Sequence, residues 1–289
     1  AAIQIVNVRG MNAKRTACLS WLGQRKHHVL RYKAKVSLQV AIFSWRYQLP
    51  SETCCKTGAT GLKLANVLRR NVSEAKARLI LIGEDPKGIV SQIRHRRLTY
   101  LSQRKMLQII RTLREIDKNG IEGRILEAGC ALGGSLVLIA SYAPDRAISV
   151  YDTFEMIPAP GPEDPPEVHQ RYATIISGRS KGIGGDTYYG YRGDLQGYVL
   201  SNVRELVGNE AVERIELYKG LLQDTMIVEE PVAFAHIDVD WYDPVKTCIV
   251  RIWPMLAKGG SLIFDDYFDW GGCKKAVDEY FHGRSDMAF

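Results

Sequence analysis

The chain has 289 residues, of which 46% are hydrophobic and 25% charged, as is ordinary for a soluble globular protein. The formal net charge is +7, but nine basic residues and no acidic residue precede Glu52, so the remainder is slightly acidic. This excludes a basic nucleic-acid-binding face on residues 120–289. No apolar run approaches the roughly 20 residues that cross a bilayer, which argues against membrane partners.

Three segments differ in pattern. Residues 1–75 have no consistent periodicity and predict a basic, poorly structured N-terminal extension. Residues 76–120 predict a helical lead-in, because apolar residues recur at helical spacing from Leu98 to Ile116 before Gly120. We expect the basic residues of this helix to form a solvated outer face. Residues 121–289 predict a single catalytic domain.

Strands and helices alternate through this domain. Apolar runs predict strands at 124–128, 147–152, 214–220, 232–238 and 261–266, and helices at 133–143, 195–208, 243–256 and 272–281. Such alternation predicts an α/β fold with a mostly parallel sheet and helices on both faces. The segment 157–192 reads as a long irregular stretch, and we interpret it as a lid over the site.

A glycine-rich turn, "EAGCALGGS", joins the first of these strands to its helix. Glycines let the backbone turn tightly and approach a ligand. The loop alone suits S-adenosylmethionine or another nucleotide equally, with a plain turn capped by Ser135 as the structural alternative. Glu127 before the loop and Asp152 after the next strand favour S-adenosylmethionine, through its amino group and its ribose hydroxyls. The candidate cofactor-binding residues are Glu127, Gly129, Cys130, Gly133, Ser135 and Asp152.

Three acids follow two further strands. Asp238 ends one, and Asp265 and Asp266 end the next. Sequential strands are often neighbours, so these carboxylates are expected to meet at one rim. Nothing in the sequence supplies enough nearby Lys or Arg to neutralise them. Hard oxygen ligands without a His–Cys set predict Mg²⁺ or another divalent cation, with helix capping as the alternative.

The neighbouring residues allow several roles. Asp240 is a fourth metal ligand, a hydrogen-bond acceptor for the ligands, or the general base. Asp243 is interpreted as the N-cap of the following helix, and Asp269 as a loop acid. His236 is interpreted as a buried, hydrogen-bonded histidine and not as a ligand.

The motifs "EAGCALGGS", "VYDTFEMIPAP", "SGRSKGIGGDTYYGY", "AHIDVDWYDPV" and "FDDYFDWGGCKKAVDEYF" together resemble the macrocin O-methyltransferase family over residues 95–282. These are bacterial enzymes that depend on S-adenosylmethionine and a divalent metal, and that methylate hydroxyls of sugars and natural products. The resemblance implies a class I methyltransferase fold. It also implies the metal ligands Asp238, Asp265 and Asp266, and a catalytic base at Asp238 or Asp240.

Two departures from the family accompany the resemblance. Family members continue past the last helix into closing strands, so we expect an exposed sheet edge beside Asp265 and Asp266. Residues 1–75 match nothing in the family.

The predicted function is methyl transfer from S-adenosylmethionine to a hydroxyl of a sugar or glycosylated natural product. The alternatives are a catechol or phenol methyltransferase, a non-catalytic paralogue that binds the cofactor, and, less favoured, an RNA methyltransferase. The six cysteines lack zinc spacing and the pattern of a secreted disulfide scaffold, so a cytoplasmic enzyme with a small-molecule acceptor is expected. The sequence leaves a homo-oligomer open.

Overall fold

The computed structural model describes residues 4–8, 59–284 and 287–288. The chain divides into two compact units, residues 1–10 with 69–289, and residues 11–68. Of the second unit, residues 59–68 are described and are helical. The part of the predicted N-terminal extension between 9 and 58 lies outside the described residues.

The sheet has the strand order β4-β3-β2-β5-β6-β1-β7. Strands β2 to β6 are parallel, β1 is antiparallel to β6, and β7 is antiparallel to β1. The strands are β1 (Gln4–Val8), β2 (Arg124–Ala128), β3 (Ile148–Asp152), β4 (Ile215–Lys219), β5 (Val232–Ile237), β6 (Leu256–Phe264) and β7 (Met287–Ala288).

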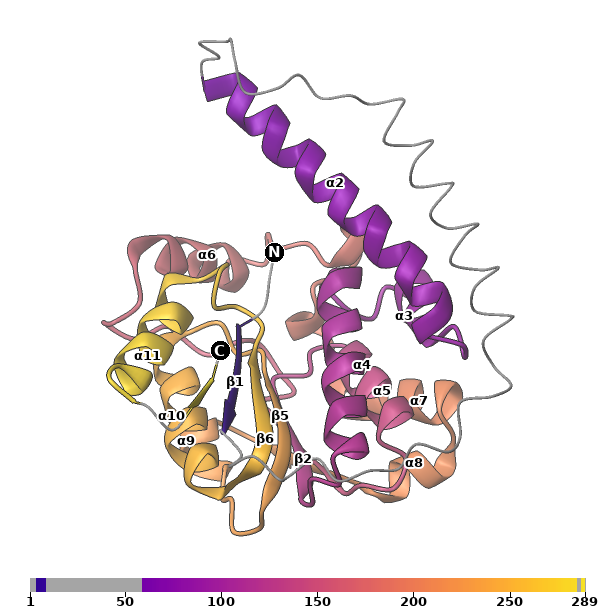
Figure 1. The fold of residues 1–289 in the computed structure, drawn as a ribbon. Coiled ribbons are helices and arrows are strands. Elements are labelled where there is room, and N and C mark those ends of the chain that lie inside the picture. Colours follow the sequence, from indigo (N-terminus) through magenta and orange to yellow (C-terminus); the bar gives the residue numbers. More distant parts are fainter. Residues whose placement is uncertain (1–3, 9–58, 285–286, 289) are drawn as a thin grey trace. The chain divides into compact units, whose positions relative to one another are not determined.

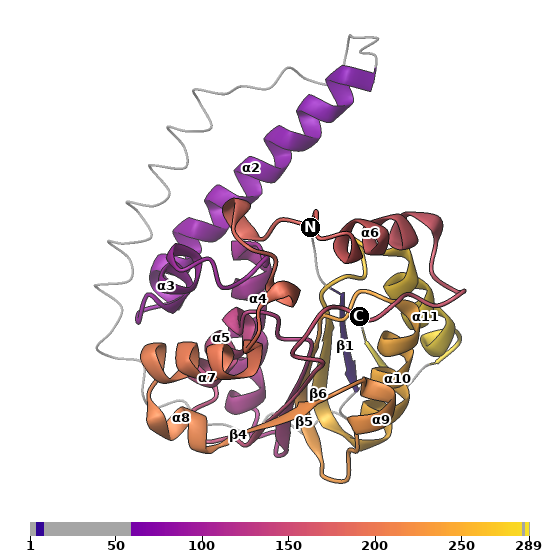
Figure 2. The same cartoon turned by 180° about the vertical axis from the view of Figure 1, so that it is seen from behind.

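Two layers of helices enclose the sheet (Figures 1 and 2). The helices are α2 (Ala59–Glu84), α3 (Ile89–His95), α4 (Gln103–Lys118), α5 (Gly134–Tyr142), α6 (Pro166–Ile176), α7 (Leu195–Leu206), α8 (Asn209–Glu213), α9 (Leu222–Thr225), α10 (Tyr242–Ile252) and α11 (Gly271–Phe281). Helices α3, α4, α5 and α7 pack on one face, and α9, α10 and α11 pack on the other.

Side chains alternate between the two faces of the sheet along each strand and so contribute to two hydrophobic cores, one on each face. Ile125 of β2 joins the cluster under α4 and α5, while Leu126 and Ala128 join the cluster under α10 and α11. Strand β5 is buried at every residue. Because both faces of a parallel strand are covered, such strands read as continuous apolar runs. This explains why the central strands were predictable within a few residues.

The sheet edge beside β6 differs from the expectation of an exposed edge. Strand β1, from the N-terminal extension, pairs with β6 from Gln4–Phe264 to Asn7–Ser261, and Val6 is buried. Strand β7 then pairs with β1. The edge of β6 is therefore covered by β1, and strands from both ends of the chain extend the sheet on this side. A strand of five residues carries too short a pattern to reveal a pairing partner some 250 residues away.

Two further differences concern helices. The segment 157–192 contains helix α6, which the sequence pattern does not reveal because only Val168 and Ile175 of this helix are buried. Residues 59–84 form α2, although the sequence pattern places the first part of this helix in the extension. None of the helices among the described residues is long and apolar enough to span a membrane.

Candidate active site

The carboxyl ends of the parallel strands meet at one rim of the sheet, the upper rim in Figure 1. The glycine loop follows β2, Asp152 ends β3, Asp238 follows β5, and Asp265 follows β6. The Asp238 N–H donates to Ala128 O at 2.9 Å, and the Asp265 N–H donates to Ile237 O at 3.0 Å. The parallel ladder thus extends one residue past β5 and β6 and holds the backbone of both acids.

Asp238, Asp265 and Asp266 converge as the strand order predicted. One carboxylate oxygen from each lies within 4.8 Å of those of the other two. Asp265 and Asp266 are buried, and Asp238 is partly buried. The structure thus brings together the three residues that the sequence analysis proposed as metal ligands.

Asp240 adjoins this acid cluster. Its N–H donates to Asp266 Oδ2 at 3.1 Å, and its φ of 56° lies in the left-handed region. Non-glycine residues rarely adopt that conformation, and where they do the surroundings must hold them there. The bond to Asp266 is one such restraint, so the backbone of Asp240 is fixed against the acid cluster.

The acids raise one another's pKa values. Burial is the main cause that raises the pKa of Asp238, Asp240 and Asp266, and the negative charges of neighbouring carboxylates add to it. Each ionised form is therefore less stable here than in water. A cation placed among the carboxylates would relieve both the burial and the repulsion.

Lys105 is a lysine beside these acids that the sequence analysis did not identify, although one ammonium group is too little to neutralise three carboxylates. Its Nζ donates to Asp265 Oδ2 at 2.6 Å, to Asp265 O at 3.0 Å and to Asp269 Oδ2 at 2.9 Å. The basic face of this helix is therefore not wholly solvated. The signal in the sequence was a single cation four residues after Leu101 and four before Ile109, within the apolar stripe of α4.

The donor set fits a divalent cation despite Lys105. One ammonium group faces a cluster of three carboxylates, and Asp265 Oδ1 is buried with no hydrogen-bond partner. Carboxylate oxygens are the ligands that Mg²⁺ prefers. An unpartnered buried oxygen beside two other carboxylates suits an ion better than helix capping.

The glycine loop lies against the acid-bearing loop. Gly129 has φ 78°, and a Cβ atom built there would stand 2.0 Å from Asp238 O. Only glycine permits this backbone conformation and this contact together. The Gly129 N–H donates to Tyr151 O at 2.8 Å, which also fixes the loop to β3.

Asp152 uses part of its carboxylate to hold the same loop. Oδ2 accepts from the N–H of Cys130 at 2.7 Å and of Ala131 at 3.3 Å, and Oδ1 accepts from Phe154 N–H at 2.7 Å. Burial raises the pKa of Asp152, and these bonds oppose that shift. A carboxylate has about four acceptor positions. Three accept these backbone N–H groups, and the fourth bond, from Thr153 Oγ1 to Oδ1, is long at 3.5 Å, so a ribose hydroxyl would compete with that bond.

Gly133 and Ser135 lie where the loop enters α5. Gly133, with φ 83°, is the N-cap and contributes no side-chain bond, so capping by Ser135 is not what begins this helix. Ser135 is buried one residue inside it. Cys130 is also buried, and burial raises the pKa of its thiol. Cys130 therefore contributes to the loop through its backbone N–H and not through a thiolate.

Glu127 and His236 form a fully buried pair on neighbouring strands. Glu127 Oε1 lies 3.4 Å from His236 Nδ1, and Glu127 Oε2 has no hydrogen-bond partner. Burial lowers the pKa of His236, but the bond to Glu127 and nearby acids outweigh it, so the net shift is upward. The unpartnered oxygen supports Glu127 as a residue that takes a cationic group.

The segment 157–192 brings aromatic side chains to the same rim. Tyr188 is buried, and its ring lies 4.4 Å from that of Tyr189. Burial raises the pKa of Tyr188 to about 12, and the charge of Asp240 adds to this. The Arg171 guanidinium of α6 lies 5.8 Å from the Tyr188 ring. These side chains therefore lie near enough to Asp240 for its charge to act on Tyr188 and for the charge of Arg171 to act on Asp240.

The segment 157–192 is anchored at the start of α10, where Asp243 was expected to be the N-cap. Helix α10 begins at Tyr242, so Asp243 lies in its first turn, exposed, and is not the N-cap. Asp164 Oδ1 instead accepts the Tyr242 N–H at 2.8 Å, and Trp241 Nε1 donates to Pro158 O at 3.0 Å. The interpretation of Asp243 was wrong because the cap comes from a residue distant in sequence.

A parallel α/β sheet with this glycine loop, and with acids at the ends of the neighbouring strands, has the class I Rossmann-like fold of methyltransferases. The chain belongs to the macrocin O-methyltransferase family, because the model of the Macrocin-O-methyltransferase (TylF) family matches residues 77–177 and 205–286. Its class of activity is S-adenosylmethionine-dependent O-methylation. These findings confirm the predicted fold class and family.

Two relatives illustrate the family. The demethyldecarbamoylnovobiocin O-methyltransferase of Streptomyces niveus is 23% identical over 202 residues, which are 66% of this chain and 70% of the relative. The mycinamicin III 3''-O-methyltransferase of Micromonospora griseorubida is 25% identical over 185 residues, which are 58% of this chain and 65% of the relative. The solved structure of the O-methyltransferase NovP has a TM-score of 0.51 at 23% identity, covering 64% of this chain and 73% of that one.

Proposed function

We propose that this chain methylates a hydroxyl of a sugar or glycosylated natural product, with a divalent cation held by Asp238, Asp265 and Asp266. The observation that carries the proposal is the direct contact between the glycine loop at Gly129 and the backbone of Asp238. This contact puts a cofactor loop and a three-carboxylate cluster side by side. The two relatives named above support the substrate class, since novobiocin and mycinamicin derivatives are their acceptors by name.

The proposed cofactor site consists of the residues around the loop. Glu127 Oε2 takes the amino group of S-adenosylmethionine, and Asp152 accepts from the ribose hydroxyls beside its bonds to the loop. Gly129, Cys130, Gly133 and Ser135 shape the backbone that passes the cofactor. When bound, the cofactor supplies an electrophilic methyl group on sulfur.

The proposed proton acceptor is Asp240, with Asp238 as the alternative. Asp240 lies beside the acid cluster and close enough to Tyr188 and Tyr189 for its charge to affect both. A divalent cation held by Asp238, Asp265 and Asp266 would supply the acidification of the acceptor hydroxyl. The tyrosines exclude water and offer ring faces to the acceptor, so much of the rate comes from alignment.

Labelled methyl transfer tests the proposed function. The protein is incubated with methyl-labelled S-adenosylmethionine, Mg²⁺ and a panel of glycosides with free sugar hydroxyls, beside catechol and caffeate. We expect label on glycosides, loss of transfer in EDTA, and recovery when Mg²⁺ is restored. Transfer that survives EDTA contradicts the metal role, and transfer to the phenols alone favours the catechol or phenol alternative. Cofactor binding without transfer to any acceptor would point to a non-catalytic protein.

The substitution Glu127→Gln tests the cofactor orientation. Removing the charge should weaken S-adenosylhomocysteine binding by about tenfold or more, since hydrogen bonds to charged groups contribute about 1.5–3 kcal/mol. Affinity for methylthioadenosine, which lacks the amino-acid group, should be unchanged. Calorimetry with both ligands measures this. Glu122→Gln, an exposed glutamate that precedes β2, is the matched control. Equal losses for both ligands would remove Glu127 from the amino-group site.

A further inference from the structure

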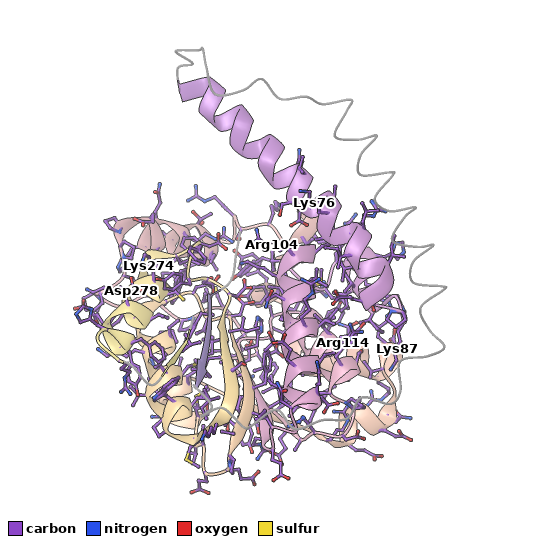
Figure 3. All side chains as sticks on the ribbon, in the orientation of Figure 1. Lys76, Lys87, Arg104, Arg114, Lys274 and Asp278 are labelled. Carbon is purple, nitrogen blue, oxygen red and sulfur yellow. The ribbon has the colours of Figure 1, made fainter. Side chains whose placement is uncertain are left out.

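Lys105 is a buried cation beside the three-carboxylate cluster. The residue is 6% exposed and donates to Asp265 through both the side chain and the carbonyl, and to Asp269. Lysines are almost never buried unless paired. The ion pair of Lys274 and Asp278 on α11 (Figure 3) is the ordinary case for comparison, because both of its side chains are about half exposed. Exposed pairs of that kind contribute little to stability.

The position of Lys105 in its helix is electrostatically unfavourable. It lies in the first turn of α4, where Ser102 Oγ accepts its N–H at 3.2 Å. The positive end of the helix dipole is at this terminus, so a cation there is repelled. Neither helix formation nor apolar packing therefore accounts for a lysine at this position. The carboxylates that its ammonium group contacts do account for it.

The two carboxylate oxygens of Asp265 differ in their contacts. Oδ2 is bound by Lys105 at 2.6 Å, whereas Oδ1 is buried without a hydrogen-bond partner. Lys105 forms ion pairs with Asp265 and Asp269, and the nearby His236 also acts on Asp238. Arg171 acts on Asp240 at longer range. One ammonium group thus turns Asp265 and offsets part of the charge of its neighbours.

We propose that Lys105 is a positioning residue that lets the three-carboxylate cluster form before a divalent cation binds. It holds Asp265 through Oδ2 and leaves the buried Oδ1 without a hydrogen-bond partner. It also supplies a positive charge that reduces repulsion between the carboxylates, a role that a bound cation would take over. The inference rests on the proposed metal role of Asp238, Asp265 and Asp266. Lys105 therefore stabilises the metal-free protein more than the metal-bound one.

The test is Lys105→Met, which keeps most of the apolar stem and removes the charge. Arg104→Met is the matched control, because Arg104 is the exposed neighbour on the same helix (Figure 3). Melting temperatures are measured in EDTA and in Mn²⁺, and Mn²⁺ affinity is measured by calorimetry. We expect Lys105→Met to melt lower than the wild type in EDTA and to recover most of the loss in Mn²⁺. Arg104→Met should follow the wild type in both.

Thermodynamic linkage between metal binding and folding requires a second result. If the ion replaces the lost charge, it must bind Lys105→Met more tightly than the wild type, and we expect about tenfold. Weaker Mn²⁺ binding in the variant would overturn the proposal, as would a melting loss of equal size with and without Mn²⁺. The latter would mean that Lys105 only ties α4 to the sheet.

A variant that does not fold in EDTA still decides the question. Folding that appears on addition of Mn²⁺ supports the proposal, and failure to fold in either condition overturns it. The proposed function fails separately. A wild type that binds no Mn²⁺ removes the metal site, whereas a wild type that binds Mn²⁺ with an affinity unchanged in Lys105→Met removes only the role of Lys105.

Discussion

Replacing Asp266 by Asn should lower Mn²⁺ affinity and metal-dependent methyl transfer by at least about a hundredfold, because loss of a ligand exceeds the 10–100-fold typical of outer-shell changes. The metal-free variant should be at least as stable as the wild type. Asn keeps an oxygen to accept the Asp240 N–H, and it removes one of three mutually repelling carboxyl groups. Calorimetry with Mn²⁺, transfer assays and thermal melts in EDTA measure these effects.

Asp266→Asn is expected to weaken Mn²⁺ binding without lowering the stability of the metal-free protein. The raised pKa of Asp266 explains why stability is not lost. The folded protein retains a proton there that the unfolded chain releases above about pH 4. Stability of the metal-free wild type therefore falls as pH rises toward the folded pKa, and it should fall less in Asp266→Asn. Asp243→Asn, an exposed acid in the first turn of α10, is the control and should change neither property. A destabilised Asp266→Asn with unchanged Mn²⁺ affinity would make Asp266 a structural residue.

The acid cluster was predictable because its signal is local to two strands. Asp238 and Asp265 each follow a buried apolar run, and the carboxyl ends of parallel strands share one rim. The strand order then needed only that β5 and β6 be neighbours, which is the usual arrangement of sequential strands. The positions of residues that directly follow a strand could therefore be predicted from the sequence.

Lys105 and Asp164 were not predictable for the converse reason. Each acts on a residue more than 75 positions away, through a helix start or a loop whose path the sequence does not specify. Lys105 looked like part of a solvated face, and Asp243 looked like a better cap than Asp164. The same limit applies to β1, whose place in the sheet depends on pairing with β6 and not on its own composition.

Gly129→Ala should be the most damaging single change in the glycine loop. The added Cβ would stand 2.0 Å from Asp238 O and 2.9 Å from Asp238 C, and backbone atoms there are held by the bond from Asp238 N–H to Ala128 O. The ends of β2 and β5 would have to separate. We expect a loss of at least about 3 kcal/mol in the free energy of unfolding, or roughly 10 °C in melting temperature.

Gly120→Ala measures the cost of the left-handed backbone conformation alone, without a collision of the added Cβ. Gly120 has φ 62°, but a Cβ added there would meet nothing within 4 Å, so only the left-handed conformation is penalised, by about 1–2 kcal/mol. Equal melting losses in the two variants would show that the loop can move away from Asp238. If the contact is as rigid as the ladder implies, Gly129→Ala should weaken S-adenosylhomocysteine and Mn²⁺ binding together. Both sites depend on the same backbone contact, so a loss confined to one of them would contradict a shared rim.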